Sequence, residues 1–66
     1  MEVKFPNVKV KLIGSDGNAF AILAKVSGAM RQAGIAKESI DEYLNESTSG
    51  DYNHLLATAM RTVEVS

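Results

Sequence analysis

Apolar and charged residues alternate in the sequence V-K-V-K-L, from residue 8 to residue 12. Successive side chains of a strand point to opposite faces, so this period predicts a strand with Lys9 and Lys11 on its solvated face. Pro6 has no backbone N–H to donate and lies just before the alternation. We therefore expect residues 1–7 to form a loose arm or an edge strand.

The middle of the chain changes to apolar steps of three and four residues, which is the period of a helix with one buried face. This pattern predicts three helices: one from Ala19 to Ala33, one that starts at residue 36 or 37 and ends before the sequence STSG, and one from Tyr52 to Arg61. Met30 and Met60 belong to the apolar positions of the first and third helices. We expect both methionines to lie in the core.

Capping residues mark the ends of these helices. Asn18 and Asp51 can each accept a hydrogen bond from a free N–H group at a helix start, and Gly34 suits a helix end. After the third helix the period returns to two, because Val63 and Val65 alternate with polar neighbours. A short final strand is expected there.

The predicted order is β-α-α-α-β in a single domain, residues 1–66, of the α+β class. The expected architecture is a small antiparallel sheet made by the N- and C-terminal strands and covered on one face by the three helices. A two-stranded sheet is only marginally stable and has exposed edges. We therefore expect a homodimer formed through a strand edge.

The composition excludes several classes of protein. The chain is 45% hydrophobic and 23% charged, with no cysteine and a net charge of −1. These values are typical of a globular domain, and disulfides and cysteine-based metal sites are excluded. The N-terminus does not read as a signal peptide and no apolar run is long enough for a membrane span, so we expect a cytoplasmic protein without membrane contact.

The sequence GSDGN, from Gly14 to Asn18, lies between the first strand and the first helix. It has neither of the glycine spacings that cradle phosphates, and Asp16 would repel a phosphate group. It also lacks the later acidic ligand of a calcium loop. The favoured interpretation is a turn in which Asn18 caps the helix, with anion or cation binding as the alternative.

A second polar cluster, TSGDYNH, precedes the third helix. Asp51 and His54 are three residues apart and could bind a metal or act as an acid–base pair, and Ser47 and Ser49 are candidate nucleophiles. A single histidine makes a poor zinc site, and no nucleophile-elbow motif is present. We therefore favour helix capping and expect no catalytic, cofactor-binding or metal-binding residues, that is, no enzyme.

Lysines on the first strand provide the alternative function. Lys4, Lys9 and Lys11 could contact the phosphates of a nucleic acid, with Phe5 available for stacking. Solvation of these lysines is the simpler interpretation, since charges on an edge strand also discourage aggregation. Weak nucleic-acid binding through Lys4, Lys9 and Lys11 is therefore kept as the second hypothesis.

Three longer stretches carry a resemblance: KLIGSDGNAFAIL, RQAGIAKESIDEYL and TSGDYNHLLATAMRTVEV. They resemble a group of small bacterial, phage and plasmid proteins of unknown function that share the patterns GxDGNAF and SGDYxxLL. The resemblance spans residues 11–65 and implies a one-domain accessory protein of mobile-element origin, without implying any site residue. We expect a non-enzymatic protein-interaction module.

Overall fold

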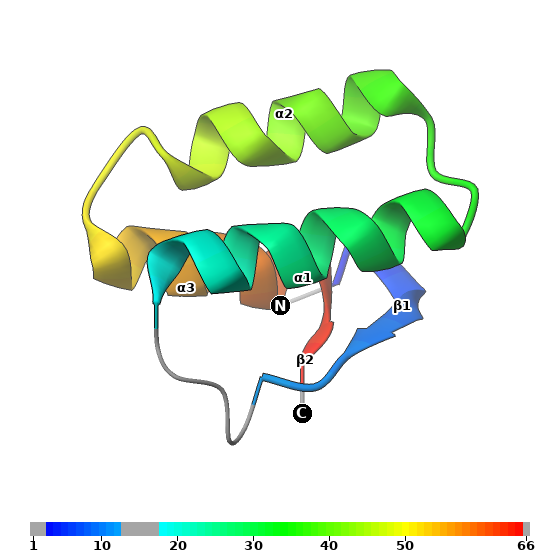
Figure 1. Ribbon diagram of the computed structural model, residues 1–66, viewed down its shortest axis with the longest axis horizontal. Coiled ribbons are helices and arrows are strands. Elements are labelled where there is room, and N and C mark those ends of the chain that lie inside the picture. The colour runs from blue at the N-terminus through cyan, green and yellow to red at the C-terminus, as the bar shows by residue number, and fades with distance from the viewer. Residues whose placement is uncertain (1–2, 13–17, 66) are drawn as a thin grey trace.

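The computed structural model describes residues 3–12 and 18–65. Its elements are β1 (Phe5–Val10), α1 (Ala19–Gln32), α2 (Lys37–Ser47), α3 (Tyr52–Thr62) and β2 (Val63–Val65), as Figure 1 shows. The predicted order and the α+β class are confirmed. The predicted turn at residues 14–17, including Asp16, lies outside the described residues, as do residues 1, 2 and 66.

The helix ends follow the capping residues of the sequence. The Asn18 side chain accepts a hydrogen bond from the backbone N–H of Phe20 at 2.8 Å, where α1 begins. Gly34 follows the end of α1 with a φ of 82°, a left-handed conformation that favours glycine. α2 begins after Ala36 without a side-chain cap, and Glu38 in its first turn complements the helix dipole.

The two strands pair in parallel, so the predicted antiparallel sheet is wrong. The reason is where α3 ends. The backbone N–H of Lys4 donates to the carbonyl of Arg61 at 2.8 Å, which places the end of α3 beside the beginning of β1. β2 follows α3 directly and pairs Val63 with Phe5, so both strands leave the same end of the sheet in the same direction.

The pairing between the strands is irregular. Lys9 faces Glu64 and Val10 faces Val65, but the register shifts between Phe5 and Lys9. The shift contains Pro6, which cannot donate a ladder hydrogen bond, so the interruption suits the residue found there. Residues 5–7 thus belong to the irregular beginning of β1.

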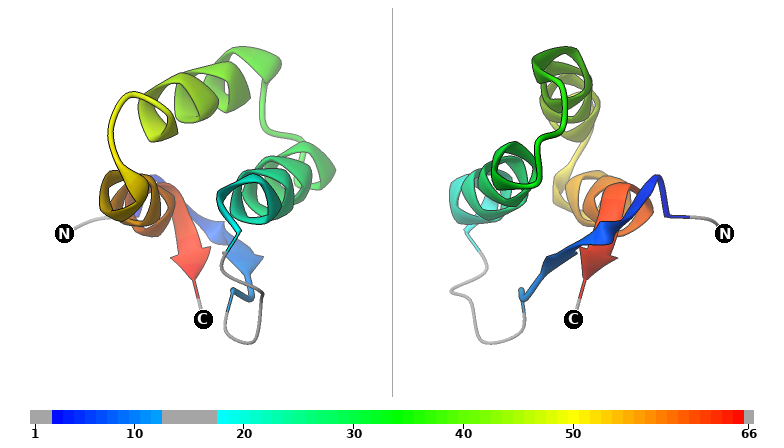
Figure 2. Two further views of the ribbon diagram at one scale, coloured as in Figure 1. Left: turned by 60° about the vertical axis from the view of Figure 1, so that its left-hand side comes forward. Right: turned by 90° about the vertical axis from the view of Figure 1, so that its right-hand side faces the viewer.

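The molecule is layered, with all three helices on one side of the strands (Figure 2). α1 packs on β1, and α3 contacts β2, which continues from it. α2 packs mainly on α1 and α3 and forms the outermost layer, and its Glu42 reaches Lys4 just before β1. The three helices thus lie on one face of the sheet, as predicted.

The core fills the space between the sheet and the helices. Its buried apolar residues come from every element: Val8, Val10, Ile22, Val26, Met30, Ile40, Tyr43, Leu55, Ala59 and Val63. Leu12 and Val65 pack against this core while partly buried, so the predicted inward face of both strands is confirmed. Met30 is fully buried as predicted, but Met60 is 61% exposed and the prediction for it is wrong.

Candidate interaction site

The turn between α2 and α3 carries the densest polar cluster of the described residues. The His54 ring nitrogen Nε2 lies 2.8 Å from the Glu46 carbonyl oxygen and 2.9 Å from Glu46 Oε2. Ser49 Oγ lies 3.2 Å from the same nitrogen and 2.7 Å from the Glu46 carbonyl oxygen. We call Glu46, Ser49 and His54 the turn cluster.

The geometry fixes the role of His54. A carbonyl oxygen only accepts hydrogen bonds, so the short contact to the Glu46 carbonyl requires a proton on Nε2. With that proton in place, Nε2 donates to Glu46 and cannot accept the proton of Ser49. The arrangement differs from a hydrolytic triad, in which serine and acid use different ring nitrogens.

The turn cluster instead closes the C-terminal end of α2. The last carbonyl groups of a helix have no partner within the helix, and the Glu46 carbonyl accepts hydrogen bonds from the His54 ring, the Ser49 hydroxyl and the Ser49 backbone N–H. Gly50 makes this approach possible, because a Cβ atom at that position would lie 2.9 Å from His54 Cγ. Glycine in the SGD sequence is thus required for close packing.

Asp51 is the N-cap of α3, as predicted, and its Oδ1 accepts from the His54 backbone N–H at 2.9 Å. The alternative of an acid–base pair between the Asp51 and His54 side chains does not form, because the His54 ring turns to Glu46. Glu46 was missed by the sequence reasoning. It lies eight residues before His54 on another helix, and no local spacing connects the two.

The environment of Glu46 favours its charged form. The hydrogen bond from His54, and after it the hydrogen bond from Ser49, holds the pKa of the Glu46 carboxyl below its ordinary value. The group is exposed to solvent, so this contact orders the turn more than it stabilises the fold. The two hydrogen bonds nevertheless hold the Glu46 carboxylate in one position beside the turn.

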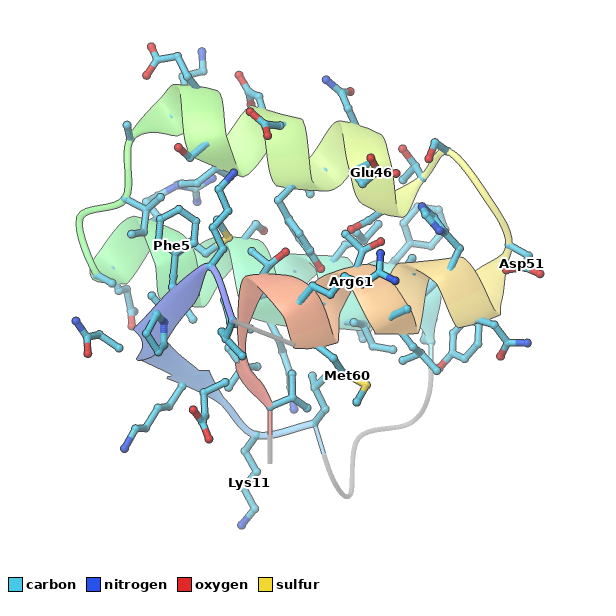
Figure 3. All side chains as sticks on the ribbon, turned by 180° about the vertical axis from the view of Figure 1, so that it is seen from behind. Phe5, Lys11, Glu46, Asp51, Met60 and Arg61 are labelled. Carbon is cyan, nitrogen blue, oxygen red and sulfur yellow. The ribbon has the colours of Figure 1, made fainter. Side chains whose placement is uncertain are left out.

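A cavity of about 250 Å³ lies beside this turn, between α2, α3 and the start of β1. Lys4 and Arg61 line it together with Glu42 and Glu46, so its charges are balanced. Lys4 Nζ lies 3.2 Å from Glu42 Oε1. Figure 3 shows Phe5, Glu46 and Arg61 at the side of the molecule where α2 and α3 face each other.

Tyr43 forms part of the cavity wall and is almost completely buried. Burial raises the pKa of its phenol above the ordinary value. Ser47, one turn later on α2, is fully buried as well. Neither hydroxyl has a hydrogen-bond partner in the described part of the chain. Two hydroxyl groups of α2 are therefore buried, and that of Tyr43 belongs to a residue of the cavity wall.

The three lysines of the nucleic-acid hypothesis, Lys4, Lys9 and Lys11, lie in different surroundings. The Lys4 ammonium is paired with Glu42 and lies 5.8 Å from the centre of the Phe5 ring. Lys9 faces Glu64 in the sheet, and Lys11 follows the other end of β1, where its carbonyl accepts from Lys25 Nζ at 3.5 Å. Lys4 thus precedes the first residue of β1 and Lys11 follows its last, where Figure 3 labels it.

The sheet itself presents an unpaired surface. Within residues 3–12 and 18–65 each strand has a single strand neighbour, so each has one edge without a ladder partner. Glu64 is exposed, and Met60, one turn before β2, is exposed as well. Figure 3 shows Met60 projecting on the strand side of α3. We call the outer edge of β2 the free edge.

Two further expectations concern metals and membranes. The described residues contain no group of three or more histidine, cysteine, aspartate or glutamate side chains placed to hold a metal ion. Among the same residues, no helix has the length and apolar character needed to cross a membrane.

No family model, no curated protein and no solved structure matches the chain. The geometry of the candidate site is therefore the only basis for a function.

Proposed function

We propose that the chain is a non-enzymatic protein-interaction module that adds an extended segment of a partner to the free edge of β2. The proposal is based on the two-stranded parallel sheet, in which β2 pairs on one side only among the described residues. Two strands make a marginal sheet, whereas a third supplies both backbone hydrogen bonds and cross-strand packing. An added strand would thus extend the sheet that the described residues form with two strands.

The edge of β2 is better suited to a partner than the edge of β1. β1 contains Pro6 and a register shift, two features that blunt strand edges. β2, Val63–Val65, contains no proline, although the Val63 backbone N–H already donates to the Ala59 carbonyl of α3. The exposed Met60 side chain adds apolar surface nearby. A second copy of the chain is one partner that this edge can take, which would give the homodimer expected from the sequence.

An amide NMR titration with a short neutral strand-forming peptide of alternating valine and threonine tests this proposal. We expect concentration-dependent shifts at residues 63–65 and at Met60, with little change along α2. Met60→Lys should weaken the response, whereas Phe20→Lys should not, because Phe20 is 79% exposed on α1 and offers a matched exposed apolar position.

Sedimentation velocity over a concentration series examines the homodimer separately. A monomer at every concentration would remove the second copy as a partner. Absence of any peptide-dependent shift at residues 63–65 would overturn the proposal. If single-stranded DNA at low salt then shifts the face of Lys9 and Lys11 alone, nucleic-acid binding is favoured; if it shifts no residue, neither function is supported.

A further inference from the structure

We infer that the segment taken by the free edge carries a basic residue flanked by apolar residues, so that its charge faces Glu64. This inference rests on the proposed function and names the chemistry of the partner. The partner is a segment of another protein with the alternation apolar–basic–apolar.

The pairing inside the chain is the model for this choice. β2 receives the sequence V-K-V of β1 with Lys9 opposite Glu64 and Val10 opposite Val65. Val10 is buried and Val65 partly buried, while Lys9 and Glu64 are exposed. Directly opposed residues on one sheet face interact, and opposite charges there are favourable.

A strand on the other edge of β2 meets the same two faces. Side chains alternate along β2, so Val63 and Val65 remain on the helix-covered face and Glu64 on the solvated face. The partner therefore needs apolar residues at the two flanking positions and a hydrophilic residue opposite Glu64. Met60, 61% exposed one turn earlier, extends the apolar surface on the α3 side.

The charge of Glu64 is available to such a strand. Among the described residues its carboxylate forms no ion pair within 4.0 Å, although Lys9 faces it in the register. A two-fold pairing of β2 with β2 of a second copy, centred on Glu64, would oppose two glutamates, which is unfavourable. A basic segment of another protein meets the edge without this penalty.

The test compares three peptides that differ only at the outward positions: alternating valine–lysine, valine–threonine and valine–glutamate. Affinities come from the NMR shifts of residues 63–65 at low salt. We expect the lysine peptide to bind about twofold to fivefold more tightly than the threonine peptide, and the glutamate peptide to bind more weakly. The preference should shrink as salt is added.

Variants separate Glu64 from the general charge of the molecule. Glu64→Gln should remove the preference and Glu64→Lys should reverse it, whereas Glu38→Lys, the same charge change on α2, should leave it intact. Equal binding of all three peptides, or a preference that Glu38→Lys abolishes, would overturn the inference while leaving the proposed function standing. No binding of any peptide would overturn both.

Discussion

The two ends of α3 are held in different ways. At its start, Asp51 caps the helix through the backbone N–H of His54, and the His54 ring nitrogen Nε2 fastens the helix to Glu46 of α2 at 2.8 and 2.9 Å. At its end, α3 passes directly into β2, which pairs on one side only within residues 3–12 and 18–65. The start of the helix is closed by contacts within the chain, while the end leads into a strand edge that has no ladder partner among these residues.

This difference shows that a dense cluster of polar side chains need not be free to bind a partner or a substrate. The turn cluster contains the residue types of a catalytic site, yet His54 and Ser49 both bind the Glu46 carbonyl and close the end of α2. β2 carries only one charged side chain, but its outer edge has no ladder partner within the described residues. An interaction site is better recognised from unsatisfied geometry than from residue types.

The largest expected change in the free energy of unfolding comes from substitutions of two methionines, one in the core and one at the open end of α3. Met30 is fully buried and Met60 is 61% exposed at the open end of α3. Met30→Ala should lower the free energy of unfolding by about 2–5 kcal/mol, because it leaves a cavity in the core. Met60→Ala should change it by about 0.5 kcal/mol or less. Urea denaturation followed by circular dichroism measures both values.

Met30→Leu keeps the fold measurable if the alanine variant does not fold, since a volume-conserving exchange costs less than about 1.5 kcal/mol. Similar losses for Met30→Ala and Met60→Ala would show that the open end is as tightly packed as the core. The contrast would then be wrong.

Substitutions of two glycines test the closed end of α3. Their expected effect on the free energy of unfolding is the second largest. A Cβ at Gly50 would press on the Cβ and Cγ atoms of His54, so Gly50→Ala should force the ring away from the Glu46 carbonyl and cost about 1–2 kcal/mol through this steric overlap. Gly28 has open space around it and lies within α1, so Gly28→Ala should stabilise by about 0.5–1 kcal/mol. Thermal unfolding of both variants gives the comparison, and an unchanged Gly50→Ala protein would mean that the turn cluster is not held by this contact.

Local patterns in the sequence were sufficient for the elements and for their caps. The alternation around Lys9 placed Val8 and Val10 inside, and Asn18 and Asp51 cap the helices they precede. Such signals are short-range, because they depend on neighbouring residues alone.

Long-range features could not be predicted in this way. The alternation of a strand is the same in parallel and antiparallel sheets, so it could not give the direction of β2. The contact between His54 and Glu46 joins two helices and has no spacing signature. Met60 has helical apolar spacing, yet it projects from α3 where no described element covers it. Tertiary packing decides all three.

The smallest expected effect concerns the charge of Glu46. Its pKa is lowered in the folded protein, so its contribution to stability is present above the unfolded pKa, about 4.3, and is lost as the pH falls through the folded value. A carbon-13 NMR titration of the carboxyl groups should show Glu46 titrating below the ordinary range. His54→Ala should bring its pKa back toward that range, because the principal hydrogen bond to the carboxylate is removed.

Lys4→Met is the control and should leave the Glu46 pKa unchanged, since Lys4 pairs with Glu42. A Glu46 pKa that stays low in His54→Ala would assign the shift to Ser49 or Arg61, and the closed end of α3 would then depend less on the histidine than on the residues around it.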